Sequence, residues 1–172
     1  PTEGALLVAA AKAGAIHLEI DEAYPRANEV PFDSERKRMI TIHNVLDPQP
    51  HDLSPIHNEK HKDWNVIAVK GAPDIVLDLC SQYQGMDDKP RPMTEKAKES
   101  ILAANDAMTK DALRVLGFAY RLEKEVPNDP EEIKTNDLEK NLVFVGLAGM
   151  IDPPRTEVKP ALEHARHAGI RT

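Results

Sequence analysis

The feature that most limits how this chain can fold is residues 142–151, LVFVGLAGMI, a run without a charged side chain. Such an apolar run predicts a strand covered on both faces of a sheet. It is about half as long as the ~20 residues that cross a bilayer as a helix. Asp152, Pro153 and Pro154 follow at once, and the restricted backbone of proline stiffens the chain there. We therefore expect residues 1–151 to form one domain and residues 152–172 to begin another.

Three other segments have the β-branched and alternating apolar residues that are typical of strands. They are residues 37–46, 64–69 and 114–122. Helical spacing and end signals predict helices at residues 3–13, 73–80, 94–111 and 156–168, the last two capped by Thr94 and Thr156. The polar or proline-containing segments 21–29, 47–63, 84–92 and 126–140 are predicted loops. Because helices do not alternate strictly with strands, we expect an α+β domain, an antiparallel sheet flanked by helices.

The formal net charge of −7 argues against two kinds of partner. An acidic surface does not attract nucleic acid or an anionic membrane, so we expect neither as a ligand. A nucleotide is not excluded, because a few lysines and arginines suffice to hold a phosphate. The chain has one cysteine, Cys80. It cannot form an internal disulfide, and we interpret it as a small buried apolar residue.

A histidine-rich loop offers a different kind of site. His51, His57 and His61 lie near Asp52, Glu59 and Asp63. The spacing of His57 and His61 would suit zinc on a helix, but the three prolines in residues 47–63 indicate an irregular loop. A metal-binding module therefore stays a weak alternative, and we predict no metal ligands. A ligand-free regulatory or protein-interaction domain is a second alternative that the residues leave open.

Familiar phosphate-binding loops, G-x-x-x-x-G-K-[ST] and G-x-G-x-x-G, do not occur in the sequence. Three short segments could instead bind a nucleotide through side chains. In PFDSERKRM, Phe32 offers a flat face for a purine and Lys37 a charge for phosphate. In VKGAP, Lys70 ends an apolar strand face and Gly71 allows close approach. In DPPR, Arg155 follows a stiff joint. Taken singly, each segment is better explained as a core residue, a solvated turn or edge, or a linker.

The order of these segments is more specific than any one of them. PTEGALL, PFDSERKRM, VKGAPD, RVLGFAYR, GLAGMIDPPR and HAGIRT follow one another along the chain. In this order they resemble the P-type cation-transporting ATPases, and most closely the calcium-transporting branch of bacteria. The resemblance covers essentially the whole chain. It implies that residues 1–151 are the later, larger part of a nucleotide-binding domain, and that residues 152–172 re-enter a phosphorylation domain.

The resemblance also implies roles for single residues. Phe32 matches the phenylalanine that stacks on adenine, and Lys70 matches the lysine that lines the adenine pocket near the phosphates. Lys37 matches a lysine of the same pocket. Some relatives carry an arginine where this chain has Ser34. That phosphate contact is therefore expected to be absent, or to come from the arginines at positions 36 and 38.

The remaining matches lie near the two ends of the chain. Glu3 matches a glutamate near the adenine edge, with Thr2 beside it. Arg114 matches an arginine at the phosphate end that bridges to the phosphorylation domain. Asp152 and Arg155 match the hinge and its phosphate-proximal part.

The implied function is ATP binding in a cation pump, with magnesium accompanying ATP in the parent protein. The phosphorylated aspartate motif, DKTGT, does not occur in this chain, so we predict no catalytic residue here and no turnover by the chain alone. A phosphatase of the haloacid-dehalogenase type needs a second aspartate two residues after the first, in a D-x-D pattern. It is disfavoured here, because two prolines follow Asp152. Expected partners are ATP, ADP and the phosphorylation and actuator domains of a membrane pump with this domain in the cytoplasm. Calcium is implied by kinship alone.

Overall fold

One sheet organises the fold of the computed structural model, which describes residues 2–48, 56–126 and 135–171. Within those residues seven strands pair in the order β1-β2-β3-β6-β7-β4-β5. The strands are β1 (Arg26–Asp33), β2 (Arg38–Asn44), β3 (Asn65–Gly71), β4 (Cys80–Gln84), β5 (Pro90–Pro92), β6 (Arg114–Glu123) and β7 (Leu142–Met150). All neighbours are antiparallel except β4 and β7, which are parallel. The predicted α+β class with an antiparallel sheet flanked by helices is confirmed.

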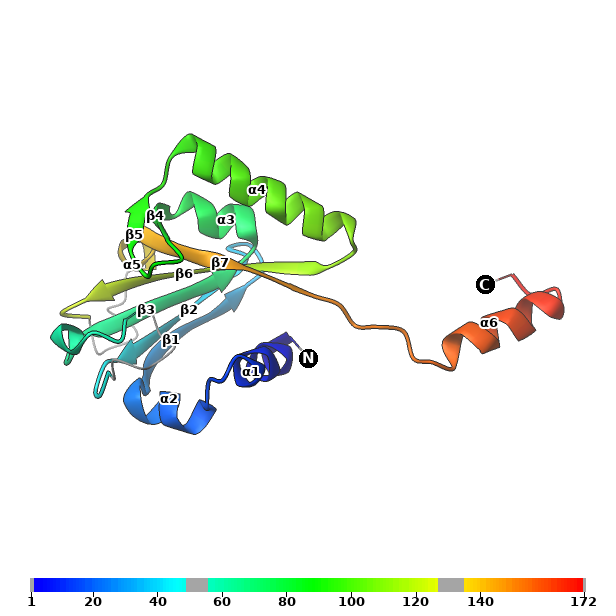
Figure 1. The fold of residues 1–172 in the computed structure, drawn as a ribbon, viewed down its shortest axis with the longest axis horizontal. Coiled ribbons are helices and arrows are strands. Elements are labelled where there is room, and N and C mark those ends of the chain that lie inside the picture. The colour runs from blue at the N-terminus through cyan, green and yellow to red at the C-terminus, as the bar shows by residue number, and fades with distance from the viewer. Residues whose placement is uncertain (1, 49–55, 127–134, 172) are drawn as a thin grey trace.

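Helices cover the sheet unevenly (Figure 1). They are α1 (Thr2–Lys12), α2 (His17–Ala23), the 3-10 turn η1 (Glu59–His61), α3 (Pro73–Asp78), α4 (Glu95–Lys110), α5 (Thr135–Leu138) and α6 (Val158–His167). Helices α3 and α4 cover one face of the sheet, where α3 packs on β3, β6 and β7. Helices α1 and α2 lie toward the other face, and neither contains a buried residue. The second face is therefore the more open one.

The main core lies between the sheet and α3. Ile40, Ile67 and Val69 on the strands are fully buried against Val76 and Leu77 of the helix. Strand alternation explains this set, because residues two apart in a strand point to the same face. A second buried cluster gathers around Tyr24, Val45, Ile56, Val66, Tyr120 and Val143. Aliphatic side chains dominate both clusters, as the few aromatic residues in the sequence require.

Some predicted loops are strands or helices in the structure. The predicted loop 21–29 contains the end of α2 and the start of β1. Strand β1 lies at the edge of the sheet and exposes most of its residues. An edge strand needs few apolar residues, so the polar sequence of β1 did not show the pattern by which a strand is predicted. The predicted loop 84–92 ends in β5, another edge strand, where proline is tolerated because no further strand needs its N–H.

Strand β7 is covered on both faces only at its beginning. Leu142, Val143 and Phe144 are buried, but Val145 is 45% exposed. Strand β4 runs beside only the first residues of β7, so among the described residues the remainder of β7 is paired with β6 alone. Beyond β7 an extended stretch leads to α6, away from the sheet (Figure 1). Thr156 does not cap α6, whose N-cap residue is Glu157 without a side-chain hydrogen bond.

The predicted cap of α4 is confirmed, whereas Cys80 is less buried than expected. Thr94 caps α4 through its hydroxyl, which accepts from the amide N–H of Ala97 at 3.2 Å. Cys80 is half-buried, its thiol donates to the Val76 carbonyl, and burial raises the pKa of the thiol to about 12. Among the described helices, none combines the length and apolar character that a membrane span requires.

His43 of β2 joins α2 to the sheet and makes the fold sensitive to pH. Its Nδ1 lies 2.9 Å from the Tyr24 carbonyl and its Nε2 lies 3.0 Å from the Thr41 hydroxyl. Burial is the main cause that lowers the pKa of His43 below its usual 6.5. At this position the unfolded chain therefore binds a proton more readily than the folded one. The contribution of neutral His43 to stability is fully present above pH 6.5 and is lost as the pH falls.

We therefore expect the free energy of unfolding, measured by urea denaturation, to fall between about pH 8 and about pH 5. His43→Gln, which cannot titrate, should flatten this decline. His17→Gln is the matched control, since His17 is exposed and forms only a surface pair with Asp21. Equal pH slopes in His43→Gln and in the unmodified chain would contradict the assignment.

Candidate functional site

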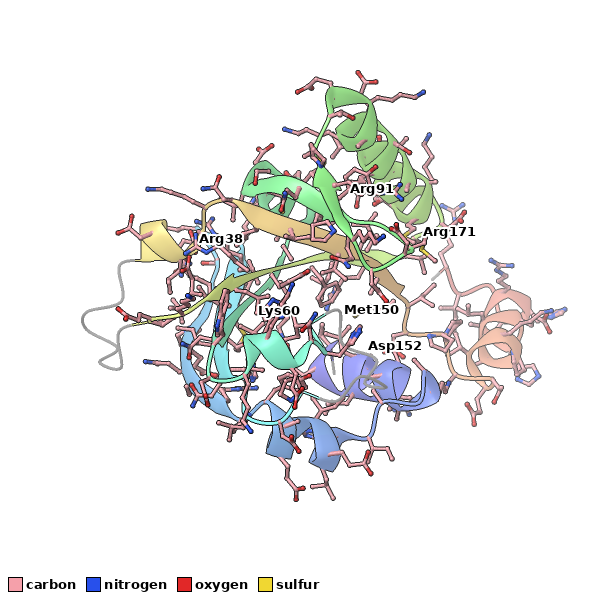
Figure 2. The ribbon with its side chains drawn as sticks, turned by 60° about the vertical axis from the view of Figure 1, so that its left-hand side comes forward. Arg38, Lys60, Arg91, Met150, Asp152 and Arg171 are labelled. Carbon is pink, nitrogen blue, oxygen red and sulfur yellow. The ribbon has the colours of Figure 1, made fainter. Side chains whose placement is uncertain are left out.

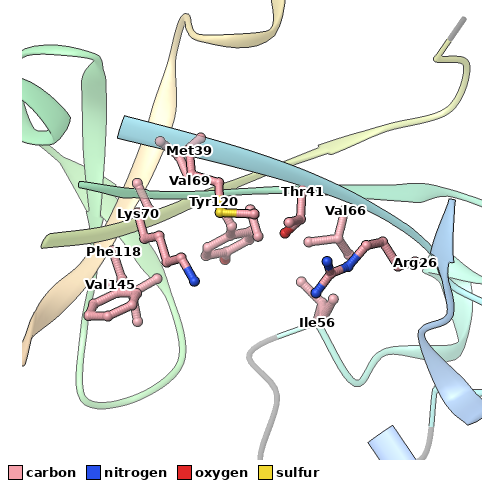
Figure 3. A pocket seen from close by; sticks show the side chains of 12 residues that line it. Arg26, Met39, Thr41, Ile56, Val66, Val69, Lys70, Phe118, Tyr120 and Val145 are labelled. Carbon is pink, nitrogen blue, oxygen red and sulfur yellow. The ribbon is translucent and has the colours of Figure 1, made fainter. Parts of the chain in front are cut away.

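A pocket of about 300 Å³ lies on the open face of the sheet (Figure 3). It crosses β2, β3 and β6 and reaches Val145 on β7. Most of its lining is apolar, with Met39, Ala68 and Phe118 among the residues of its floor. Concave, largely apolar pockets with few polar groups are the usual form of small-molecule sites.

Lys70 is the charged side chain at the β6–β7 side of this pocket (Figure 3). Val66, Ala68 and Lys70 alternate with the core residues Ile67 and Val69 along β3. The same alternation therefore turns the lysine to the open face and the aliphatic residues into the core. This agrees with the strand face predicted from the sequence. The side chain of Lys70 is 24% exposed, so its ammonium lies close to the sheet rather than in free solvent.

The beginning of α1 meets the sheet beside the pocket. Glu3 forms an ion pair with the ammonium of Lys70. The adjacent residue, Thr2, accepts a hydrogen bond from Nη1 of Arg114 at 3.4 Å. The structure thus brings together four of the residues predicted from the sequence, in two pairs. All four are near one end of the β3–β6 pair, because Lys70 is opposite Phe118 and Arg114 begins β6.

The opposite end of the pocket has polar residues that the sequence reading missed. Arg26 points toward the pocket from β1, while its Nη1 also contacts Glu29 at 2.7 Å. Thr41 lines the middle of the pocket. Tyr120 contributes its ring, because its hydroxyl donates to Gln84 at 2.9 Å and burial raises its pKa. Of these, Tyr120 could have been found from the alternation of residues 114–122.

Two further predicted residues lie near the end of β1 and in the turn that joins it to β2. Phe32 is 63% exposed near the end of β1 and is not among the residues that line the pocket. Lys37 is exposed and has a positive φ of 53°. Asp33 closes the turn, since its Oδ1 accepts from the amides of Glu35 at 2.9 Å and Arg36 at 2.7 Å. The turn stands beside the pocket because Met39, which follows it, is paired with Lys70.

Gly71 is where the turn and β3 come closest. A Cβ built on Gly71 would overlap the carbonyl oxygen of Lys37 and lie 2.7 Å from the Cβ of Arg38. The same carbonyl accepts a hydrogen bond from the amide of Ala72 at 3.0 Å. The glycine after Lys70 therefore has a steric cause: any side chain would push the turn away from the strand.

The guanidinium groups of Arg36 and Arg38 are both paired in the structure. They form ion pairs with Glu139, which is buried and directly follows Leu138 of the main core. The two alternatives, that the phosphate contact missing at Ser34 is absent or comes from one of these arginines, stay predictions, and the pairing with Glu139 favours its absence.

Asp152 and Arg155 lie apart from the pocket. Both are exposed in the extended stretch between β7 and α6, and Figure 2 shows Asp152 just beyond Met150 at the end of β7. No residue of the stretch lines the pocket. The structure therefore does not bring these two residues to the other predicted site residues.

The described histidines do not assemble a metal centre. Across residues 2–48, 56–126 and 135–171 no group of three or more metal-ligating side chains converges. His61 packs instead on Trp64, with ring centroids 5.3 Å apart, and burial lowers its pKa. His51 and Asp52 lie outside the described residues.

Comparisons with known proteins show the family of the chain. Residues 1–157 match the family model of the P-type ATPase cytoplasmic domain N. The chain therefore belongs to the P-type cation-transporting ATPases. Over its full length it is 38% identical to calcium-transporting ATPases of Listeria monocytogenes and Bacillus cereus, and 35% identical to one of Bacillus subtilis. It spans about 17% of the length of these relatives.

The close approach at Gly71 can be tested by adding one methyl group. We expect Gly71→Ala to lower the free energy of unfolding by about 1–3 kcal/mol, because the turn or the strand must shift. Gly146→Ala is the matched control, since a Cβ on this strand glycine meets nothing within 4 Å. Urea denaturation of both variants measures the difference. Equal stabilities would contradict the steric role of Gly71.

Proposed function

We propose that this chain is the ATP-binding domain of a cation pump, and that the pocket on the open sheet face holds the nucleotide. The observation that carries the proposal is an apolar pocket of about 300 Å³ with Lys70 at its rim, in a chain of this family. A purine is flat and largely apolar, whereas its phosphates are anionic. An apolar floor beside an ammonium group fits both parts of such a ligand.

In this proposal the base lies against the floor of the pocket. Met39 and Phe118 contact its face, and Phe32 stacks on it from the rim. Lys70 breaks its ion pair with Glu3 and binds the nucleotide instead. The carboxylate of Glu3 is then free to accept a hydrogen bond from the edge of the base. These roles favour a nucleotide over a purely apolar ligand, since an uncharged ligand would leave the ammonium of Lys70 paired as it is.

The phosphates then extend toward the cations at the edge of the sheet. Lys37 on the turn and Arg114, with Thr2 beside it, are the proposed phosphate contacts. Both cations are exposed, so each contributes modestly and the attraction weakens with salt. Magnesium would accompany the phosphates in the complete pump, as it does in other phosphoryl-transfer enzymes.

We assign residues 1–151 to the nucleotide-binding domain and residues 152–172 to a hinge and the first helix of a phosphorylation domain. Asp152 and Arg155 are then hinge residues that approach the phosphates only when the domains close. The chain positions ATP for an aspartate that is not part of it, so its contribution is orientation rather than bond-making. The phosphorylation and actuator domains of the pump are its proposed partners, on the cytoplasmic side of the membrane.

Calcium is the proposed transported ion, because several relatives at 35–38% identity are named as calcium-transporting ATPases. Others, at 34% identity, are named as cation-transporting ATPases. The cation class is therefore the firmer part of the assignment.

Affinity should be modest. One stacked base and one or two charged hydrogen bonds, of about 1.5–3 kcal/mol each, must offset at least about 4 kcal/mol of lost translational and rotational freedom. We expect dissociation constants from about 100 μM to a few mM. ADP should bind almost as well as ATP if the γ-phosphate makes few contacts in this domain.

Amide NMR titration with ATP, ADP and GTP tests the proposal. We expect saturable shifts around Met39, Lys70 and Phe118. Lys70→Ala should weaken ATP binding roughly tenfold or more, because a charge-assisted hydrogen bond is lost. Phe32→Ala should weaken it by roughly fivefold or more, through lost stacking.

Lys98→Ala is the control for Lys70→Ala. Lys98 lies on α4, on the other side of the sheet, where it pairs with Asp78 at 2.6 Å. Its removal should leave ATP binding unchanged. A folded sample that shows no saturable shift at several millimolar nucleotide would overturn the proposal and favour a ligand-free interaction domain.

A further inference from the structure

Glu139 is the buried charge that the proposed nucleotide site does not explain. It lies directly after α5 and is 3% exposed, the one charged residue classed as buried within the described part of the chain. Its two carboxylate oxygens form ion pairs with Arg36 and Arg38, about a hundred residues earlier in the sequence. A buried carboxylate is costly unless it is paired, and here two guanidinium groups supply the pairing.

An ion cluster of this kind is weak evidence for stability. Well-packed apolar residues of similar volume commonly do as well or better in such positions. Leu138, immediately before Glu139, already packs in the main core with Ile40 and Ile42. An apolar side chain could therefore occupy position 139. Unlike Glu139, it would not form directed ion pairs with the turn between β1 and β2.

The turn that the cluster binds is the one beside the proposed site. Arg36 lies within it and Arg38 begins β2, and Nη1 of Arg38 also donates to the Arg36 carbonyl at 2.9 Å. Lys37, between them, keeps a positive φ of 53°, a conformation that costs free energy for a residue other than glycine. The two ion pairs hold the residues on either side of this strained position.

The direction of the arginines matters for the pocket. Arg38 and Ile40 share the core face of β2, whereas Met39 and Thr41 line the pocket on the opposite face (Figure 3). Because side chains alternate along a strand, holding Arg38 toward Glu139 fixes Met39 toward the pocket. The same ion pairs fix the position of Lys37 in the turn and of Phe32 on the strand before it.

We propose that Glu139 is a positioning residue of the nucleotide site. Through Arg36 and Arg38 it fixes the turn that contains Lys37 and directly follows the end of β1, where Phe32 lies. It acts from the side of the sheet opposite to the pocket and is not among the described residues that line the pocket. This inference rests on the proposed function for its ligand, but the order of the turn is a property of the free chain. The two can therefore fail separately.

The test compares Glu139→Gln and Arg36→Gln with the unmodified chain. In the free protein, both variants should shift and broaden the amide signals of residues 34–38. With ATP, both should raise the dissociation constant roughly threefold to tenfold, as substitutions remote from a ligand do when they act on its site. Arg36→Gln keeps the Arg38–Glu139 pair and serves as the variant that folds if Glu139→Gln does not.

Two controls separate positioning from stability. Leu77→Ala removes a fully buried side chain of α3. It should lower stability without altering the turn signals or the ATP dissociation constant. Glu123→Gln removes the partner of Arg121 in a more exposed pair, 2.9 Å apart, and should change neither.

The possible outcomes are distinct. Turn signals and ATP affinity that are unchanged in Arg36→Gln, or in a folded Glu139→Gln, would overturn the positioning role and leave Glu139 a structural residue. A loss of affinity in Leu77→Ala equal to that in the charge variants would overturn it as well. If the unmodified chain binds no ATP, the proposed function fails, and the turn signals of the free variants still decide whether Glu139 orders the turn.

Discussion

The register of β3 between β2 and β6 is the constraint on which the rest of the structure depends. In that register Met39, Lys70 and Phe118 form one row across the three strands, and Ile40 and its neighbours form the next. Successive rows face opposite sides of the sheet. A slip of one residue would turn Lys70 into the main core and expose a row of aliphatic side chains. The same hydrophobic pattern that stabilises the fold therefore also sets the lysine beside the pocket.

Two close approaches keep that register in place at one end. Gly71 leaves room for the backbone of the β1–β2 turn, and Gly117, its partner on β6, lies where a Cβ would be 3.1 Å from the Cα of Pro73. The glycines thus leave room for the turn beside β3 and for the start of α3 beside β6. Pro73 begins α3 where its missing N–H is not needed. The motif around Lys70 is consequently a packing motif as well as a candidate for binding.

Much of this arrangement could be predicted from the sequence, and the reasons for the failures are physical. The central strands were found because both local pattern and burial favour them, and β2 and β3 pair as antiparallel neighbours in the expected kind of sheet. The edge strands β1 and β5 were missed because exposure removes the apolar pattern that identifies a strand. The covering of β7 was overestimated, since composition does not reveal that β4 pairs with only its first residues.

The features of the site also divide into those that a local sequence pattern predicts and those that it does not. The face of Lys70 followed from alternation within one strand, which is a local property. The contacts of Glu3 with Lys70, and of Glu139 with two arginines, join residues 67 and about a hundred positions apart. No local pattern contains such pairs. The arginines of PFDSERKRM therefore suggested phosphate ligands, although their charges are taken up by a carboxylate on the other face of the sheet.

This division of charges explains how an acidic chain can offer a site for an anion. The formal net charge of −7 acts mainly at long range, where salt screens it beyond roughly 8–10 Å. Within that distance the described residues that line the pocket include Lys70 and Arg26 and no carboxylate. Glu3, which pairs with Lys70 from outside, sits on a helix with no buried residue. Little packing opposes its displacement, so an arriving phosphate competes with one exposed carboxylate rather than with the charge of the whole chain.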